Sequence, residues 1–122
     1  MDRKRFEELV AEAYESLPEH FKERLENVDI LVEDWPSPEQ LKQVGLSRRD
    51  ELFGLYEGVP LPKRGSGYQM VLPDRITIFR KPILMRYHSE EAIRRKVRST
   101  LRHEIAHYFG ISDQRLKEID RY

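Results

Sequence analysis

The 122-residue sequence contains no cysteine. This absence excludes disulfide bonds and thiolate metal sites, so any metal must be held by histidine and carboxylate ligands. The sequence also has no apolar run long enough to cross a bilayer, and its first residues are too polar for a signal peptide. We therefore expect a soluble, cytoplasmic protein without a membrane partner.

The sequence also lacks a net charge, because 22 Lys and Arg residues balance 22 Asp and Glu residues. A neutral chain has no bulk electrostatic attraction to nucleic acid, so we expect no nucleic-acid partner. Charged residues still make up 36% of the chain, and asparagine occurs once, at Asn27. Together with the excess of arginine over lysine, this composition hints at a thermophilic source. The length predicts a single domain spanning residues 1–122.

Apolar spacing predicts the secondary structure of the first two thirds of the chain. A helical stripe begins at Phe6 and ends at Leu17, with Asp2 near its start and a shorter turn after Pro18. A second, short helix is predicted from Pro38 to Val44, with Ser37 as its cap. Residues 60–67 contain two prolines and two glycines, which predicts a loop. The predicted strands are Val28–Val32, Leu52–Tyr56, Tyr68–Leu72 and Arg75–Phe79.

The longest predicted helix follows Ser89, and its first turn carries acidic residues that suit the helix dipole. Gly110 is a natural left-handed stop for this helix, and a short terminal helix follows it. One face of the long helix is apolar, while the neighbouring face holds polar residues. The apolar face consists of Ile93, Val97, Leu101, Ile105 and Tyr108.

The polar face contains the motif His103-Glu104-x-x-His107, which is followed by Gly110 and Asp113. Residues four apart share one face of a helix, so the two imidazoles can bind one metal ion. A shuffled chain of this composition would contain HExxH about once in a hundred trials. Requiring the glycine and the aspartate lowers that chance to well below roughly one in ten thousand, so we interpret the motif as a site.

A catalytic zinc ion takes three protein ligands and one water molecule. Asp113 lies six residues beyond His107 and past a glycine turn, which makes it the best-placed third ligand. It also lies where a cap of the terminal helix belongs, and Glu118 or Asp120 could take its place as the ligand. Glu104 projects about 100° round the helix from His103 and is placed to act as a general base toward water.

The pattern HExxHxxGxxD resembles that of the zincin metallopeptidases, and of their metzincin branch in particular. The whole chain resembles the bacterial minimal zincin-like metallopeptidases, which share its length, a strand-proline-strand element and an end soon after the motif. The resemblance implies a zincin-like α+β fold, with a small mixed sheet of three or four strands against an N-terminal helix and a long metal-binding helix. It implies one Zn²⁺ on His103, His107 and Asp113, and Glu104 as the catalytic base for hydrolysis of peptides or small proteins by a monomer.

Two departures from the metzincin pattern keep other functions open. No methionine follows Asp113, and no C-terminal subdomain is available to form the lower wall of a substrate cleft. One alternative is a zincin-shaped binding module with weak or no turnover. Another is a zinc hydrolase that acts on a non-peptide substrate such as RNA.

The sequence leaves the remaining parts of a peptidase site unranked. The strand Tyr68–Leu72 is our prediction for the edge that binds substrate backbone. The loop Lys63–Gly67 beside it is either a lid or a plain mobile connection. We interpret a basic run on the long helix as a solvated face directed away from the metal; its members are Arg94, Arg95, Lys96, Arg98 and Arg102. Candidate donors to an oxyanion are Tyr56, Tyr68, Tyr87, His88 and Tyr122.

Overall fold

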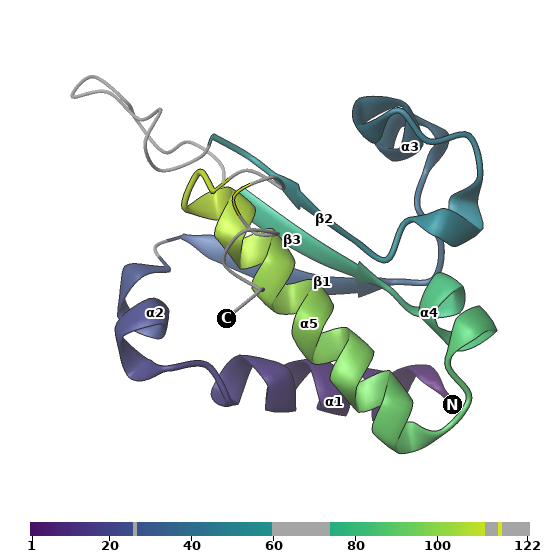
Figure 1. Ribbon diagram of the computed structural model, residues 1–122, viewed down its shortest axis with the longest axis horizontal. Helices are drawn as coiled ribbons and strands as arrows, with labels where there is room; N and C mark the ends of the chain where they lie inside the picture. The colour runs from purple at the N-terminus through teal and green to yellow at the C-terminus, as the bar shows by residue number, and fades with distance from the viewer. Residues whose placement is uncertain (26, 60–73, 112–114, 116–122) are drawn as a thin grey trace.

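The structure is a computed structural model that describes residues 1–25, 27–59, 74–111 and 115 (Figure 1). The chain contains helices and one small mixed sheet, so the fold is α+β. The first half contains α1 (Arg3–Glu15), α2 (Glu19–Arg24), β1 (Val28–Glu33), α3 (Pro38–Val44) and the 3₁₀ turn η1 (Arg49–Glu51). The second half contains β2 (Gly54–Glu57), β3 (Asp74–Phe79), α4 (Arg80–Arg86) and α5 (Glu90–Tyr108).

The sheet has three strands within the described residues, in the order β1-β3-β2. β1 runs parallel to β3, with Val28 opposite Asp74, and β2 runs antiparallel to it, with Gly54 opposite Ile78. The mixed sheet that the sequence predicted is therefore confirmed. β3 lies in the centre because its residues from Ile76 to Phe79 are apolar or β-branched and buried on both faces, as a strand covered on two sides requires.

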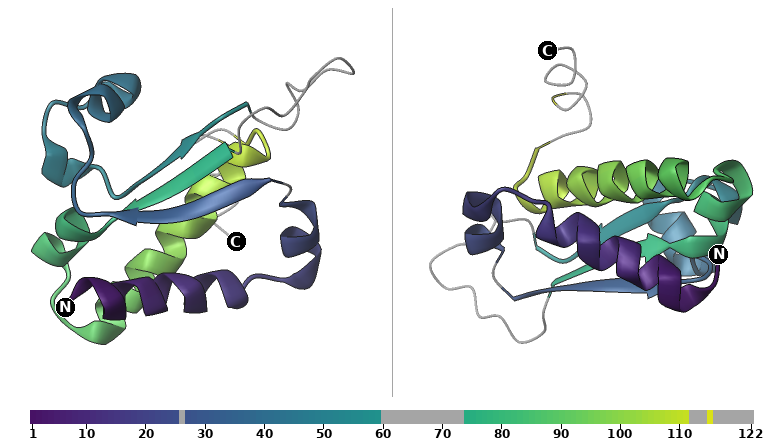
Figure 2. Two further views of the ribbon diagram at one scale, coloured as in Figure 1. Left: turned by 180° about the vertical axis from the view of Figure 1, so that it is seen from behind. Right: turned by 90° about the horizontal axis from the view of Figure 1, so that it is seen from below.

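α1 and α5 lie side by side across one face of the sheet, as two views show (Figures 1 and 2). Their apolar stripes meet Ile76 and Ile78 of β3 in the main core. The other face of the sheet is partly covered near α3, where Leu55 and Phe79 are buried with Leu52. The predicted apolar face of the long helix is confirmed, because its five residues, Ile93, Val97, Leu101, Ile105 and Tyr108, are at most 4% exposed.

The helix caps that the sequence predicted are also confirmed. The side chains of Asp2, Ser37 and Ser89 each accept a backbone N–H from the first turn of the helix that follows. Such caps each stabilise a helix by about 1 kcal/mol. Gly45 follows α3 with a φ of 73°, in the left-handed region. These contacts fix where α1, α3 and α5 begin, and hence the register of α5 along the sheet.

Two elements differ from their prediction. β2 begins at Gly54 instead of Leu52, because η1 ends at Glu51 and the chain needs two residues to reach the sheet. The helix α4 was not predicted at all. Proline usually breaks a helix, but Pro82 lies in the first turn of α4. Backbone N–H groups in the first turn have no acceptor within the helix, so the N–H that proline lacks is not needed there. The predicted strand Tyr68–Leu72, the Lys63–Gly67 loop and the terminal helix lie outside the described residues. Among the described helices, none has the length and apolar character needed to span a membrane.

Candidate metal centre

The two histidines and the glutamate of the motif come together on the side of α5 that faces β2. Ligand atoms of His103, Glu104 and His107 all lie within 4.8 Å of one another. The two imidazole rings are 4.6 Å apart between centroids, at an angle of 74°. His103 is exposed and His107 half-buried, whereas Glu104 is only 6% exposed. The helical spacing therefore produces the predicted cluster, with its acid on the inner side.

The cluster fits a zinc ion. Zn–N bonds are about 2.0–2.1 Å long, so two tetrahedral ligand atoms on one ion lie about 3.3 Å apart. A separation of up to 4.8 Å between atoms on exposed or half-buried side chains is closed by small χ rotations. Imidazole and carboxylate are the donors that zinc accepts when thiolates are absent. His103 and His107 are the two residues that would hold the metal.

Glu104 is held in place by the sheet. Its Oε1 atom accepts a hydrogen bond from the backbone N–H of Tyr56, at 2.9 Å, and lies 3.2 Å from Nδ1 of His107. A buried carboxylate needs such donors, because an unpaired charge is costly to bury. The strand edge therefore fixes the carboxylate beside the histidine. The sequence analysis missed this role of Tyr56, since its partner lies 48 residues away.

Gly54 allows the helix to approach the strand this closely. A Cβ atom at residue 54 would lie 2.6 Å from Cγ2 of Thr100 and 3.3 Å from Cγ of Glu104. Contacts this short force neighbouring atoms to move. Gly54 was not predicted to matter for the site, but its missing side chain is what lets Glu104 reach the edge of β2.

The hydroxyl of Tyr56 serves a different purpose from the oxyanion donor that the sequence analysis considered. It donates a 2.6 Å hydrogen bond to Oδ2 of Asp74, which is 4% exposed, and the Tyr56 ring packs edge-on against Tyr108. Tyr87 and His88 precede α5, about 20 Å along its axis from His103 at 1.5 Å per residue. Tyr56 is thus a structural residue of the site, and the other two lie too far from it.

The far side of the site is formed where α5 ends. Gly110 has a φ of 80°, in the left-handed region, and its N–H donates to the carbonyl of His107 at 2.9 Å. Ile111 then donates to the carbonyl of Ala106, also at 2.9 Å, which completes a glycine C-cap. The predicted stop at Gly110 is confirmed. Asp113, Glu118 and Asp120 lie outside the described residues, so the choice of third ligand stays a prediction.

Comparison with known proteins agrees with this geometry. The family model described as zincin-like metallopeptidase matches residues 25–122. The chain belongs to the zincin-like metallopeptidase family. It is similar to the solved structure of a conserved hypothetical protein from T. thermophilus, with 25% identity and a TM-score of 0.60, over 89% of this chain and 94% of that one. No curated protein matches the chain.

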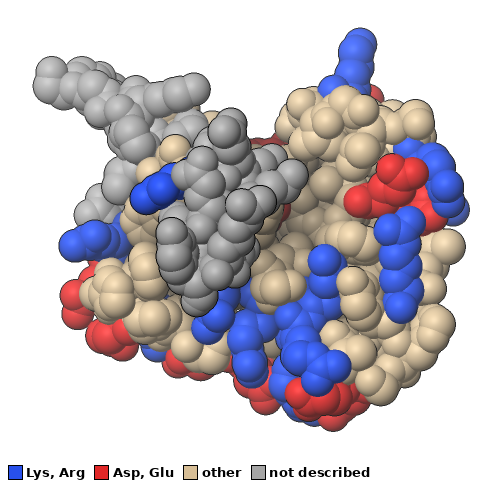
Figure 3. Space-filling model, in the orientation of Figure 1, with Lys and Arg blue, Asp and Glu red and all other residues tan. Residues whose placement is uncertain are grey.

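A groove of about 660 Å³ runs beside the metal centre of this zincin-like chain, between the start of β2 and α5. Its lining includes His103 and Glu104, and also four basic residues: Arg95, Lys96, Arg98 and Arg102. The prediction that the basic run faces away from the metal was therefore wrong for Arg95, Lys96 and Arg102. Residues 96, 99 and 103 share one helical face and residues 95, 99 and 102 the adjoining one, whereas Arg98 lies about 140° round the helix from His103. Figure 3 shows Lys and Arg side chains gathered over α5.

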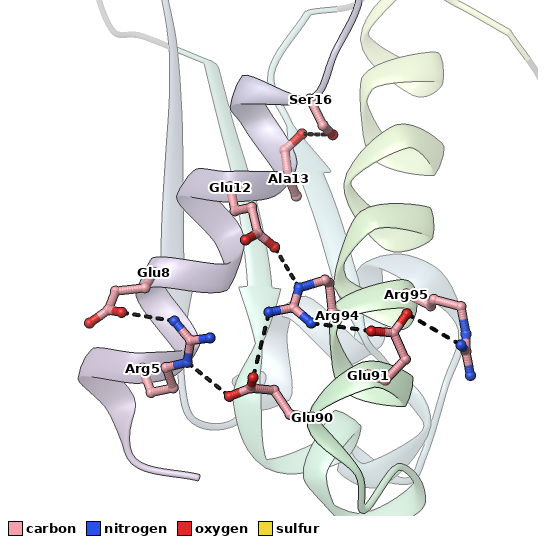
Figure 4. Close-up of polar contacts among 9 residues, drawn as sticks. All are labelled: Arg5, Glu8, Glu12, Ala13, Ser16, Glu90, Glu91, Arg94 and Arg95. Atoms are coloured by element: carbon pink, nitrogen blue, oxygen red, sulfur yellow. Dashed lines mark hydrogen bonds and ion pairs between the residues drawn. The ribbon is translucent and has the colours of Figure 1, made fainter.

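Arg94, the remaining member of the basic run, points toward α1 (Figure 4). Its guanidinium contacts Glu12 at 2.6 Å and lies within 3.5 Å of Glu90. Arg5 donates to the same Glu90 at 2.9 Å. This hydrogen bond from Arg5, together with the charge of Arg94, holds the pKa of Glu90 below its ordinary value. The network joins the start of α5 to α1 and so fixes the helix that carries the metal centre.

Proposed function

We propose that this protein is a zinc-dependent peptidase in which Glu104 is the general base. The observation that carries the proposal is the position of the Glu104 carboxylate, which is buried, hydrogen-bonded to a strand edge and within 4.8 Å of ligand atoms of both histidines. Membership of the zincin-like metallopeptidase family supports the same reaction class. One ion bound by His103, His107 and, from the sequence motif, Asp113 completes the proposed site.

Each residue of the site has a distinct chemical role in this proposal. A bound zinc ion supplies Lewis acidity, which polarises a carbonyl and lowers the pKa of water. Glu104 takes a proton from the attacking water and returns it to the leaving amine. The hydrogen bonds that described residues make to Glu104 are at Oε1, so Oε2 is the oxygen that carries the proton. The N–H of Tyr56 keeps this carboxylate in one orientation throughout.

The substrate backbone has a place to bind beside these residues. Phe79 N–H donates to Phe53 C=O, so the backbone N–H and C=O groups of residues 53, 55 and 57 pair with β3. The backbone N–H and C=O groups of Gly54 and Tyr56 therefore point away from β3. β2 is the outer strand of the sheet as far as the chain is described. The Tyr56 N–H is already used by Glu104, so an extended peptide would pair with this edge through the backbone of Gly54 and would lie beside Glu104. We propose β2 as a substrate strand; the predicted strand Tyr68–Leu72 lies outside the described residues and stays a prediction.

The test uses the Glu104→Gln variant, because an amide keeps the shape of the side chain but accepts no proton. We expect it to bind zinc as the wild type does, and to hydrolyse a mixed peptide library more slowly by about 10²- to 10⁴-fold. Metal content is measured on protein never exposed to chelator, and hydrolysis by mass spectrometry of the library. Hydrolysis retained in this variant would contradict the role of Glu104.

The same experiment separates the alternative functions. Wild-type protein that holds stoichiometric zinc but cleaves no peptide would favour a binding module. Cleavage of an RNA substrate without peptide turnover would favour a non-peptide hydrolase. A wild-type protein that binds no zinc would contradict all of these proposals together.

A further inference from the structure

We propose that the groove between β2 and α5 selects acidic peptide segments, so that this protein cleaves chains carrying Asp or Glu near the scissile bond. This inference rests on the proposed peptidase function and adds the substrate class to it. It concerns the four cations that line the groove beside His103 and Glu104. Neither the family nor the motif assigns a role to these cations.

The cations of the groove are poorly matched with acidic partners among the residues that the structure describes. Arg95 lies 3.4 Å from Glu91, but both side chains are more than 60% exposed, and such pairs are weak. Among the described residues, Lys96, Arg98 and Arg102 contact no carboxylate within 4.0 Å. The chain as a whole is neutral, whereas the described lining of the groove holds four cations and one carboxylate, that of Glu104, which is a local concentration of positive charge.

Arg98 gives a second, independent observation. Its Nε atom is buried and has no hydrogen-bond partner among the described residues. Guanidinium groups bind carboxylates with two parallel hydrogen bonds, so Arg98 is suited to an Asp or Glu side chain.

Lys96 is positioned by aromatic rings. Its Nζ atom lies 4.5 Å from the centroid of Phe53 and 5.7 Å from that of Tyr87. A cation over ring faces is attracted to them but keeps its N–H groups available for an anion. Phe53 also lines the groove, so the ring under the Lys96 ammonium is an apolar part of the groove wall. The positive charge is thus held in place at the groove wall.

The positions of the cations predict which substrate residues they contact. At 1.5 Å per residue, Arg95 lies about 12 Å along the axis of α5 from His103. An extended peptide advances about 3.3 Å per residue, so Arg95, Lys96 and Arg98 lie level with side chains about two to four residues from the scissile bond, and Arg102 lies level with the bond itself. The cations lie toward the start of α5 from the metal centre, so the preference applies to one side of that bond.

The lining favours a peptide over a nucleic acid, which would also be attracted by positive charge. Single-stranded nucleic acids bind through aromatic faces on which bases stack. The described lining offers one phenyl ring, Phe53, which Lys96 already covers, and one imidazole, His103, which the proposed metal would occupy. The outward-facing backbone of Gly54 in the same wall instead matches an extended peptide.

The test measures binding and does not depend on turnover. A fluorescein-labelled decapeptide with four Glu residues and its Gln counterpart are titrated with full-length Glu104→Gln protein, and fluorescence anisotropy is recorded. We expect the Glu peptide to bind about five- to tenfold more tightly, and the difference to shrink in 0.5 M NaCl. In the same background, Lys96→Gln with Arg102→Gln should remove most of the difference. Lys4→Gln with Lys42→Gln, which removes two exposed cations outside the groove, should leave it unchanged.

Each outcome separates this inference from the peptidase proposal. Preference for the Glu peptide without any hydrolysis by the wild type would support the groove and contradict only the peptidase. Equal binding and equal cleavage of the Glu and Gln peptides would overturn the groove inference and leave the peptidase standing. A ten-nucleotide oligoadenylate RNA that binds more tightly than the Glu peptide would also overturn it, in favour of nucleic acid.

Discussion

Gly54 shows how much of the candidate site depends on one absent side chain. We expect Gly54→Ala to push α5 away from β2 and to lower the free energy of unfolding by about 1–3 kcal/mol, the usual cost of overpacking. The closest obstruction is Cγ2 of Thr100, 2.6 Å from the added Cβ. Thr100→Ser removes that methyl group, so the double variant should recover part of the loss. Urea denaturation of the four proteins gives the coupling free energy.

The single variant Thr100→Ser is the control for this cycle, since it opens space without adding any atom. Additive effects of the two substitutions would contradict the steric explanation. The same proteins test the link to the site, because displacement of Glu104 from the Tyr56 N–H should reduce peptide hydrolysis in Gly54→Ala and restore part of it in the double variant.

At this scale the sequence predicts the members of the site that are close together in the chain. His103, Glu104 and His107 follow from helical spacing alone, because four residues are little more than one turn. Gly54 and Tyr56 do not follow from it. Their roles arise when β2 is placed against α5, and no local pattern encodes a contact across 48 residues.

The docking of α5 on α1 supports the site at the scale of elements, and it depends on Glu90. The pKa of Glu90 is lowered in the folded protein, first by the hydrogen bond from Arg5. Its contribution to stability is therefore fully present above its ordinary pKa of 4.5 and is lost as the pH falls through the folded value. We expect Glu90→Gln to be less stable than the wild type at pH 7, and the gap to narrow as the pH falls below about 4.5.

Thermal unfolding of both proteins from pH 7 to pH 3 checks this expectation. Glu39→Gln is a matched control, because Glu39 is also in the first turn of a helix but has no ion-pair partner among the described residues. If the difference in Tm between wild type and Glu90→Gln stays constant with pH, the ion pairs of Glu90 with Arg5 and Arg94 contribute nothing to stability.

Interactions between residues close in the sequence predict the elements of this chain well. Features that depend on contact with a strand elsewhere in the fold are not predicted. Asp2, Ser37 and Ser89 cap helices through contacts within three residues, so the sequence reveals them. α4 was missed because Pro82 breaks helices except in their first turn, and the boundary is set by β3 before it. The direction of the basic run was misjudged for a similar reason. Only the position of β2 shows which side of α5 forms the groove.

For the whole molecule, the metal site is coupled to folding, because its ligands converge only in the folded chain. A metal that binds the folded state alone stabilises it by about 2.7 kcal/mol at a hundred times its Kd. For a chain of this size we therefore expect zinc to raise Tm by about 10 °C, and EDTA to reverse the increase. Differential scanning calorimetry without zinc and with free zinc at a hundred times its Kd measures the shift.

Variants of single residues assign this shift to the proposed ligands. His103→Ala and His107→Ala should abolish it, because each removes an imidazole of the cluster. His88→Ala is the matched control, since His88 is exposed and precedes the start of α5. Its loss should leave the increase in Tm with zinc unchanged. Among the three acids that compete as third ligand, Asp113→Ala should reduce the shift, while Glu118→Ala and Asp120→Ala should not. A full shift in Asp113→Ala would assign the third position to another acid and separate the metal centre from the sequence motif that predicted it.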